Sequence, residues 1–375
     1  MFLQRLAVTG LRNLDAVDIH LAPGVNLFYG INGSGKTSLL ESVYLLSRGR
    51  SFRTRNLRSV INHQLPDCTC FGSLVDEAGR TTTIGVNRTA DGEFLFKVGG
   101  EPVRSASRLS ETLPVQLLNS DSFQLLEGPP SHRRAFLDWG VFHVEQEFRH
   151  LWSRFQRCLK HRNSLLRHGR IDPLQLAVWD REFVQLADRI ADLRALYTED
   201  FQPVFNDIGT RLGVVAGVKL NSLAGWDRSQ DLEALLRDGL DRDRKAGHTQ
   251  LGPHRADLRI QVNGRAAAEV LSRGQAKVLV TALKLAQGCL LRQRSGRHCI
   301  YLLDDLPAEL DPRHRAKVGA LLRDMGVQVL VTGVEQKDLL ASWPPDTGDE
   351  DPSPYPRMFH VEQGRVLDTG SINQD

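Results

Sequence analysis

The stretch GINGSGKTSLL, residues 30–40, decides how this chain folds. A short apolar run at residues 25–29 precedes it, and leucine and valine residues at helical spacing follow it. The order is therefore strand, glycine-rich loop and helix. The loop has the pattern Gly-x4-Gly-Lys-Thr, in which glycines let consecutive backbone N–H groups turn toward a phosphate and the helix N-terminus adds partial positive charge. The sequence thus predicts a phosphate-binding loop for a nucleotide.

Two side chains of this loop have specific expected roles. Lys36 is expected to contact the β- and γ-phosphates and to be catalytic, and the Thr37 hydroxyl is expected to bind Mg²⁺. ATP and Mg²⁺ are therefore the expected ligands. The loop residues expected to surround the nucleotide are Gly30, Ile31, Asn32, Gly33, Ser34, Gly35, Lys36, Thr37 and Ser38.

A second stretch, CIYLLDDLPAELD at residues 299–311, supplies carboxylates for such a site. Residues 300–303 form a continuous apolar run, which is typical of a strand covered on both faces, and Asp304 follows at its carboxyl end. Asp304 is expected to hold the metal, directly or through water. Asp305 is then placed to orient or deprotonate the attacking water. The alternative is that both aspartates only cap the segment that follows.

The third stretch is LSRGQ, residues 271–275, which precedes a helix expected from about Gln275 to Leu291. For an isolated Ser-x-Gly, the simplest interpretation of Ser272 is a helix N-cap. The longer string resembles the signature of ABC-type ATPases, which contacts the γ-phosphate of a nucleotide held by another nucleotide domain. Ser272, Gly274 and Gln275 are therefore expected at the nucleotide. Because this chain has one phosphate loop, the resemblance implies an ATP-dependent homodimer.

The distribution of patterns predicts an α/β fold with an insertion. Alternating strand-like runs occur in residues 2–29 and again around 70–75, 81–86 and 93–98, with a hairpin expected at Asp91-Gly92, and strands return after Gly252-Pro253. We expect an ABC-type ATPase head with a mixed sheet and a β-rich lobe, formed by residues 1–129 and 248–375. Residues 130–247 are expected to form an inserted α-helical arm. The proline-rich stretch at 343–356 is expected to be a solvated loop.

Composition excludes several classes of protein. The 375 residues are 25% charged and 41% hydrophobic, an ordinary globular balance. No run of eighteen apolar residues is present, so no membrane-spanning segment is expected. The five cysteines lack the spacing of a disulfide framework or a zinc site, which favours a reducing cytoplasm.

The charge distribution is more informative than the net charge of +3. Between residues 131 and 170 there are nine arginines or lysines and three acids. Such a stripe suits contacts with DNA phosphates, which are independent of base sequence. Arg154, Arg157 and Arg162 are the candidate DNA-binding residues. The alternative is an ordinary solvated face.

Several longer stretches resemble the RecF family, relatives of the SMC ATPases. They are LRNL at 11–14, SFR at 51–53, EGPPSHRRAFLD at 127–138, DDLPAELD at 304–311 and FHVEQGRV at 359–366. The resemblance covers the chain from end to end. It implies a bacterial cytoplasmic DNA-repair protein whose ATP-bound dimer binds double-stranded DNA and gap junctions. It also implies partnership with RecR and RecO in placing RecA on gaps coated by single-strand-binding protein.

The resemblance also implies roles for individual residues. Arg12 and Asn13 would lie beside the nucleotide, and Asp311 would lie at the dimer interface. Gln116 or Gln124 would be the glutamine that senses the metal, and the spacing does not select between them.

One residue departs from the pattern of ABC-type ATPases, most of which carry glutamate where this chain has Asp305. The shorter side chain withdraws the carboxylate by one methylene, and an error of about 1 Å costs on the order of a hundredfold in rate. We therefore expect a weak, DNA-stimulated ATPase in which hydrolysis acts as a release switch. Two other readings remain: the cytosolic ATPase module of a membrane transporter, and a structural SMC-like clamp, for which the insertion is short.

Overall fold

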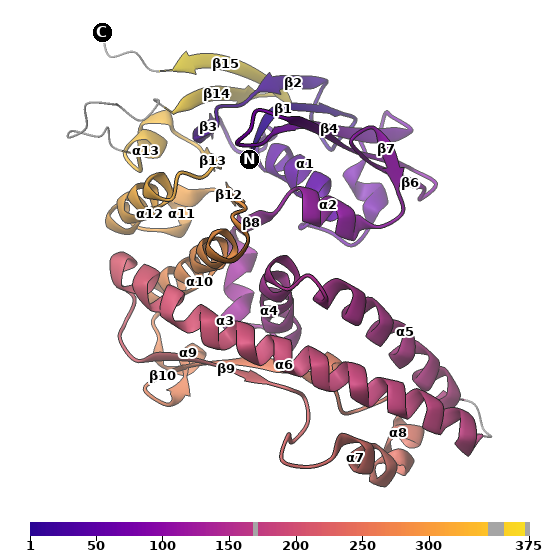
Figure 1. Ribbon diagram of the computed structural model, residues 1–375. Helices are drawn as coiled ribbons and strands as arrows, with labels where there is room; N and C mark the ends of the chain where they lie inside the picture. Colours follow the sequence, from indigo (N-terminus) through magenta and orange to yellow (C-terminus); the bar gives the residue numbers. More distant parts are fainter. Residues whose placement is uncertain (168–171, 344–355, 372–375) are drawn as a thin grey trace. The chain divides into compact units, whose positions relative to one another are not determined.

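The computed structural model describes residues 1–167, 172–343 and 356–371 (Figure 1). Most of the proline-rich stretch that was expected to be a solvated loop lies outside these residues. The chain divides into two compact units. The first comprises residues 1–122, 211–214 and 277–375, and the second comprises residues 123–210 and 215–276.

The first unit contains an antiparallel sheet of six strands in the order β2-β1-β4-β5-β6-β7. Its strands are β1 (Phe2–Thr9), β2 (Val17–His20), β4 (Asp67–Val75), β5 (Thr81–Thr89), β6 (Phe94–Val98) and β7 (Glu101–Val103). A turn containing Gly92, at φ +92°, joins β5 to β6, so the hairpin expected at Asp91-Gly92 is confirmed. This sheet is the predicted β-rich lobe.

A second six-stranded sheet of the same unit has the order β15-β14-β3-β13-β12-β8. Its strands are β3 (Val25–Tyr29), β8 (Val115–Leu118), β12 (Ile300–Leu303), β13 (Val329–Gly333), β14 (Arg357–Glu362) and β15 (Arg365–Ser371). Neighbours from β14 to β8 are parallel, whereas β14 and β15 are antiparallel. The sheet is therefore mixed, as predicted. Every residue of β12 and β13 is buried, as expected of parallel strands covered on both faces.

Helix α1 (Lys36–Arg48) joins the two sheets of the first unit. Its residues Leu39, Leu40 and Val43 are fully buried in one core cluster with residues of β1, β4, β12 and β13. The helix ends at Gly49, whose φ of +61° is a left-handed C-cap that glycine adopts without strain. The other helices whose described residues lie wholly in this unit are α2 (Ala106–Thr112), α11 (Leu306–Glu309), α12 (Pro312–Asp324) and α13 (Gln336–Leu340).

The second unit combines helices with a small sheet. Its helices are α3 (Gln124–Glu127), α4 (Pro130–Val144), α5 (Phe148–Arg167), α6 (Pro173–Leu212), α7 (Leu232–Asp238), α8 (Leu240–Ala246) and α9 (Ala267–Val270). The last two residues of α6 belong to the first unit. Strands β9 (Val218–Leu223), β10 (Asp257–Val262) and β11 (Arg265–Ala266) form an antiparallel sheet. Helix α10 (Arg273–Ser295) begins in this unit and continues into the first from Lys277.

These boundaries differ from the expected helical arm at residues 130–247. The strand β10 was expected to return to the ATPase head, yet it pairs over six residues with β9 of the second unit. Its alternating buried residues Leu258, Ile260 and Val262 belong to that small sheet. The unit therefore begins at residue 123, continues to residue 276 and is not purely helical.

Across the residues that the structure describes, no helix combines the length and apolar character needed to cross a membrane. All five cysteines have free thiols. Burial raises the pKa of the Cys68 thiol to about 11 and that of Cys158 to about 12. These thiols are therefore protonated and packed at neutral pH, which makes them poor nucleophiles.

Candidate nucleotide site

The glycine loop that precedes α1 has the backbone geometry that its sequence predicts. Gly30 has φ +151°, and a Cβ at this position would lie 2.2 Å from the carbonyl oxygen of Val361. Gly35 has φ +119°, and a Cβ there would lie 2.9 Å from the side chain of Leu14. Both positions therefore require glycine, because other residues add strain and a clash.

A cavity of about 450 Å³ opens beside this loop in the first unit. It is lined by Arg12, Asn13, Asn32, Gly33, Gly35, Lys36, Thr37, Ser38, Arg53, Ser59, Ile61, His63, Asp304, Asp305 and Thr332. The structure thus brings together most of the residues that were expected at the nucleotide, although they come from three separate stretches, at 12–13, 32–38 and 304–305. The expected residues that are not among the described lining residues are Gly30, Ile31 and Ser34 of the loop, and Ser272, Gly274, Gln275 and Asp311.

Lys36 lies at the first turn of α1 with 8% of its surface exposed. Its Nζ donates to the carbonyl oxygens of Gly30 at 2.7 Å and Ile31 at 2.8 Å. Burial lowers the pKa of the ammonium group, and the carboxylates of Asp305 and Asp304 oppose that shift. The lysine is therefore a partly desolvated cation at the wall of the cavity, where an anion would interact with it strongly.

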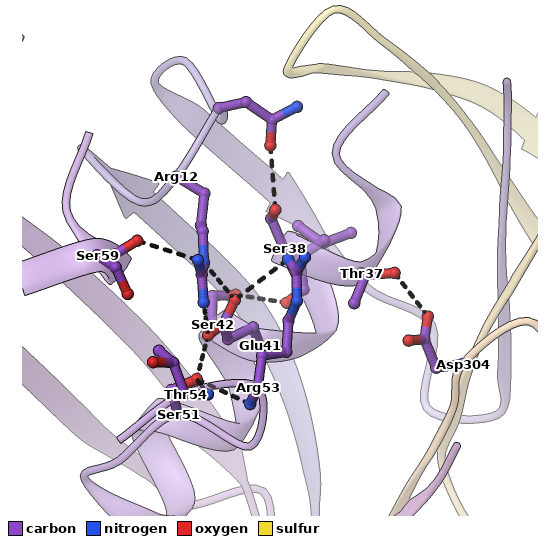
Figure 2. Close-up of polar contacts among 12 residues, drawn as sticks. Arg12, Thr37, Ser38, Glu41, Ser42, Ser51, Arg53, Thr54, Ser59 and Asp304 are labelled. Atoms are coloured by element: carbon purple, nitrogen blue, oxygen red, sulfur yellow. Dashed lines mark hydrogen bonds and ion pairs between the residues drawn. The ribbon is translucent and has the colours of Figure 1, made fainter. Parts of the chain in front are cut away.

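Thr37 and Asp304 meet at the carboxyl end of β12. The Thr37 hydroxyl donates to Asp304 Oδ1 at 3.0 Å, and the Thr332 hydroxyl donates to the same oxygen at 2.8 Å. Burial raises the pKa of Asp304, while these two hydrogen bonds act in the opposite direction. Figure 2 shows the Thr37 and Asp304 side chains pointing toward one another.

The oxygens of Thr37 and Asp304 fit Mg²⁺, which prefers hard oxygen ligands and binds proteins through one or two carboxylates plus substrate phosphates. No group of three or more His, Cys, Asp or Glu side chains able to hold a metal occurs among the described residues. A complete shell for Mg²⁺ at this place would therefore need oxygens from a bound phosphate or from water.

Asp305, the expected water-positioning residue, also lines the cavity. Its backbone is left-handed, at φ +51° and ψ +47°, and its N–H donates to Thr332 Oγ1 at 2.8 Å. One threonine hydroxyl therefore contacts both aspartates. Thr332 was not among the residues predicted for the site. The available signal was its place near the end of the apolar run VLVTG, because parallel strands present their carboxyl ends at one edge of a sheet.

Arg12 and Asn13, implied by the family resemblance, lie beside the loop. Asn13 Nδ2 donates to the Gly33 carbonyl at 2.9 Å, and its Oδ1 accepts from the Ser38 hydroxyl at 3.0 Å. Arg12 has an unusual backbone φ of +54° and points its guanidinium at Glu41 of α1 (Figure 2). Both residues therefore contact groups of the loop or of the helix that follows it.

The signature residues are placed at the start of α10. The Gln275 N–H donates to Ser272 Oγ at 3.3 Å, and the Ser272 N–H donates to Gln275 Oε1 at 2.9 Å. This reciprocal pair is a capping box, so the N-cap interpretation of Ser272 describes its local geometry. Ser272, Gly274 and Gln275 are all exposed, which leaves them open to a second protein.

The remaining residues implied by the resemblance have other partners. Asp311 is the N-cap of α12, and its carboxylate accepts from the His314 backbone N–H at 3.0 Å. A hydrogen bond with the His314 side chain lowers the pKa of Asp311. Gln116 is buried in β8 and donates to Gln287 at 2.8 Å, while Gln124 begins α3. Neither glutamine lines the cavity, so the choice between them stays open.

Fewer of the basic residues between 131 and 170 are exposed and unpaired than the sequence suggested. Arg133 makes a bidentate pair with Asp257 at 2.7 and 3.0 Å, and Arg134 donates to the Ala256 carbonyl at 2.8 Å. These two arginines of the family motif are thus engaged inside the second unit. Arg157 and Lys160 of α5 are exposed, and Arg154 is exposed but paired with Glu182 at 2.8 Å. Residues 168–170 of the stripe lie outside the described residues.

The prediction that Arg162 binds DNA is wrong, because this residue is buried. Its side chain has no exposed surface and donates to Asp180 at 2.6 Å, Asp243 at 2.7 Å and Thr249 at 2.7 Å. These bonds tie α5 to α6 and α8. A guanidinium buried in this way cannot contact a DNA backbone, so Arg162 is structural. The signal was present in the sequence: Phe155, Cys158, Arg162 and Leu166 share one helical face, and that face is buried.

Comparisons with known proteins agree with this architecture. The family described as "RecF/RecN/SMC N terminal domain" matches residues 2–342. The crystal structure of an Smc head bound to the C-winged helix domain of ScpA has a similar fold, with a TM-score of 0.59 and 13% identity over 99% of this chain and 98% of that chain. Together, the glycine loop, the mixed sheet and the cavity define an ATPase head of the SMC type.

Two relatives identify the family within this class of ATPase heads. The DNA replication and repair protein RecF of Cellvibrio japonicus (strain Ueda107) is 50% identical over 366 residues, covering 98% of this chain and 99% of the relative. RecF of Pseudomonas paraeruginosa is 46% identical, with both chains covered completely. The chain belongs to the RecF family of DNA replication and repair proteins. A solved structure of the recombination mediator protein RecF-ATP in the RecFOR pathway has a TM-score of 0.84, at 25% identity over 98% of both chains.

Proposed function

We propose that the protein is an ATP-dependent DNA-binding switch. Its ATP-bound homodimer would bind double-stranded DNA and gap junctions in the cytoplasm and act with RecR and RecO in placing RecA on gaps. The observation that carries this proposal is the cavity beside the glycine loop, where Lys36 and the Thr37–Asp304 pair converge. Membership of a family of DNA replication and repair proteins favours this reading over a transporter module.

ATP and Mg²⁺ are the ligands that the residues of the cavity fit. Lys36 would contact the β- and γ-phosphates, and Thr37 and Asp304 would hold Mg²⁺. The metal supplies charge neutralisation on the phosphate oxygens when it is bound. A relative described as RecF-ATP supports ATP as the nucleotide.

Asp305 would orient the attacking water. Its carboxylate is one methylene shorter than the glutamate found in most ABC-type ATPases, which supports slow turnover. Slow hydrolysis suits a dimer that stays on DNA while ATP is bound and releases the DNA after ATP is hydrolysed. Because Ser272, Gly274 and Gln275 are exposed, a second copy could dock on them and complete a composite site.

Thr332→Val should slow hydrolysis by about ten- to hundredfold while ATP affinity stays within about twofold. Valine keeps the shape of threonine but can neither donate to Asp304 Oδ1 nor accept from the Asp305 N–H, which leaves that donor unsatisfied. Phosphate release at saturating ATP measures the rate. Thr332→Ser retains the hydroxyl and should be close to wild type. Equal losses in both variants would assign Thr332 to packing alone.

DNA binding is tested with a gapped duplex in a titration with ATP, with ADP and without nucleotide. We expect tight binding only with ATP. In the same assay, Arg157→Gln/Lys160→Gln should weaken binding and reduce the slope of log affinity against log salt by about 2, since each phosphate contact contributes about 0.9. Both side chains are exposed on α5, so the fold should not change.

The matched control removes the same charge elsewhere in the second unit, with Arg237→Gln/Arg242→Gln on α7 and α8, whose side chains are also exposed. The slope should stay at the wild-type value there. An equal change in both double variants would mean that net charge, and not α5, governs binding. If the wild-type protein bound gapped DNA equally well with and without ATP, the proposed switch would be wrong.

A further inference from the structure

Glu41 is a carboxylate buried completely in α1, one and a half turns after Lys36. It accepts two hydrogen bonds from the Arg12 guanidinium, both at 2.9 Å, and a third from the Ser51 hydroxyl. A buried charge is costly unless it is paired and its lone pairs are satisfied. Glu41 meets both conditions, and Figure 2 shows these side chains gathered around it.

A second arginine approaches the same carboxylate with different geometry. Arg53 Nη1 lies 3.7 Å from Glu41 Oε2, beyond hydrogen-bond distance, and 43% of its side chain is exposed. Arg12, by contrast, is bidentate and 18% exposed. Both arginines line the cavity. Two cations therefore share one carboxylate, so the cluster of Arg12, Arg53 and Glu41 carries one more positive than negative charge.

The three residues come from separate segments. Arg12 lies in the turn after β1, Glu41 lies in α1, and Arg53 lies in the segment that follows α1. Among the described contacts, the two arginines share one partner, the Glu41 carboxylate. This carboxylate thus connects both arginine-bearing segments to the helix that begins at the phosphate loop.

We propose that Glu41 is a positioning residue of the nucleotide site. It holds the Arg12 guanidinium in a fixed position at the cavity wall. It holds Arg53 only loosely, so that the Arg53 guanidinium can leave Glu41 and pair with an anionic group that enters the cavity. This inference rests on the proposed binding of ATP. It adds a carboxylate that touches no nucleotide but decides how strongly the cavity attracts one, because a preorganised cation loses less freedom on binding than a mobile one.

The test measures the Kd for ATP by calorimetry with Glu41→Gln, which keeps the shape of the side chain but removes its charge. We expect the Kd to rise about tenfold, within the range for coupled contacts. Arg12→Ala should have a similar effect, and the double variant should be no weaker than the weaker single variant, because both changes remove the same contact. Binding by Glu41→Gln that is unchanged or tighter would overturn the proposal, since simple charge removal beside an anion site strengthens binding.

Because Glu41 is buried, thermal unfolding is recorded for each variant, and a second variant avoids the carboxylate. Arg12→Lys retains the charge but cannot form the bidentate pair. We expect its Kd to rise as in Glu41→Gln, and wild-type affinity would contradict the fixed orientation of Arg12. The control Asp18→Asn makes the same acid-to-amide change in an exposed pair with Arg5 and should leave the Kd unchanged.

Lys36→Ala is titrated alongside to separate two kinds of failure. If the wild-type protein binds no ATP, or Lys36→Ala binds as tightly as wild type, the proposed function itself fails. If those two behave as expected and Glu41→Gln and Arg12→Lys do not, only the role of Glu41 is wrong.

Discussion

Lys36→Ala should abolish ATP-dependent dimerisation and lower hydrolysis by at least about a hundredfold. Lys36 is almost buried, its ammonium group donates to two loop carbonyls, and the residue lines the cavity where the phosphates are proposed to bind. Alanine removes that charge without disturbing the glycines that shape the loop. Light scattering with ATP measures the dimer, and phosphate release measures hydrolysis.

Lys97→Ala on β6 is the matched control, because it removes one lysine from an exposed position of the same unit. It should dimerise and hydrolyse ATP as the wild type does. Normal ATP-dependent dimers of the Lys36 variant would show that the loop is not the site through which ATP acts.

Ser272→Arg should also reduce hydrolysis by about a hundredfold or more, although the chain still binds ATP through its own loop. If Ser272 of one subunit completes the site built on Lys36 of another, a bulky cation there misplaces the reacting groups, and an error of about 1 Å has this effect. Specific activity of the wild type should rise with protein concentration. Mixing Ser272→Arg with Lys36→Ala should restore partial activity, because one of the two sites in the heterodimer then carries neither defect.

Ser272→Ala distinguishes this role from helix capping. It removes the bond to the Gln275 N–H and should cost about 1 kcal/mol of stability, as for other N-caps. A cap alone predicts that both Ser272 variants lose stability and keep their activity per folded molecule. Activity that is independent of concentration, with no heterodimer on mixing, would contradict the composite site.

The sequence predicted the parts of the site that are contiguous in the chain. The glycine loop, the apolar strand before Asp304 and the strand-helix order around them are local patterns with local physical causes, and the structure has each of them. The resemblance to the RecF family was also confirmed. That the loop and Asp304 meet could be anticipated, because the carboxyl ends of parallel strands share one edge of a sheet.

Contacts between distant segments escaped prediction. In the sequence, Glu41 looks like any acidic residue on an amphipathic helix. Its role becomes visible only through its hydrogen bonds with Arg12 and Ser51, which come from other segments. Thr332 has no pattern of its own, and its role depends on two hydrogen bonds across neighbouring strands. The division at residue 276 depends on the pairing of β10 with β9, which no local pattern of either strand specifies.

The left-handed backbone of Asp305 links the chemistry of the site to its conformational preferences. Aspartate tolerates such a backbone better than glutamate does, because its short side chain can hydrogen-bond locally. A longer carboxylate at residue 305 would reach further into the cavity but would disfavour the turn that aims it there. Under the proposed function, an exchange of Asp305 for glutamate would therefore also strain this turn, so one backbone torsion would help to set how long the ATP-bound dimer stays on DNA.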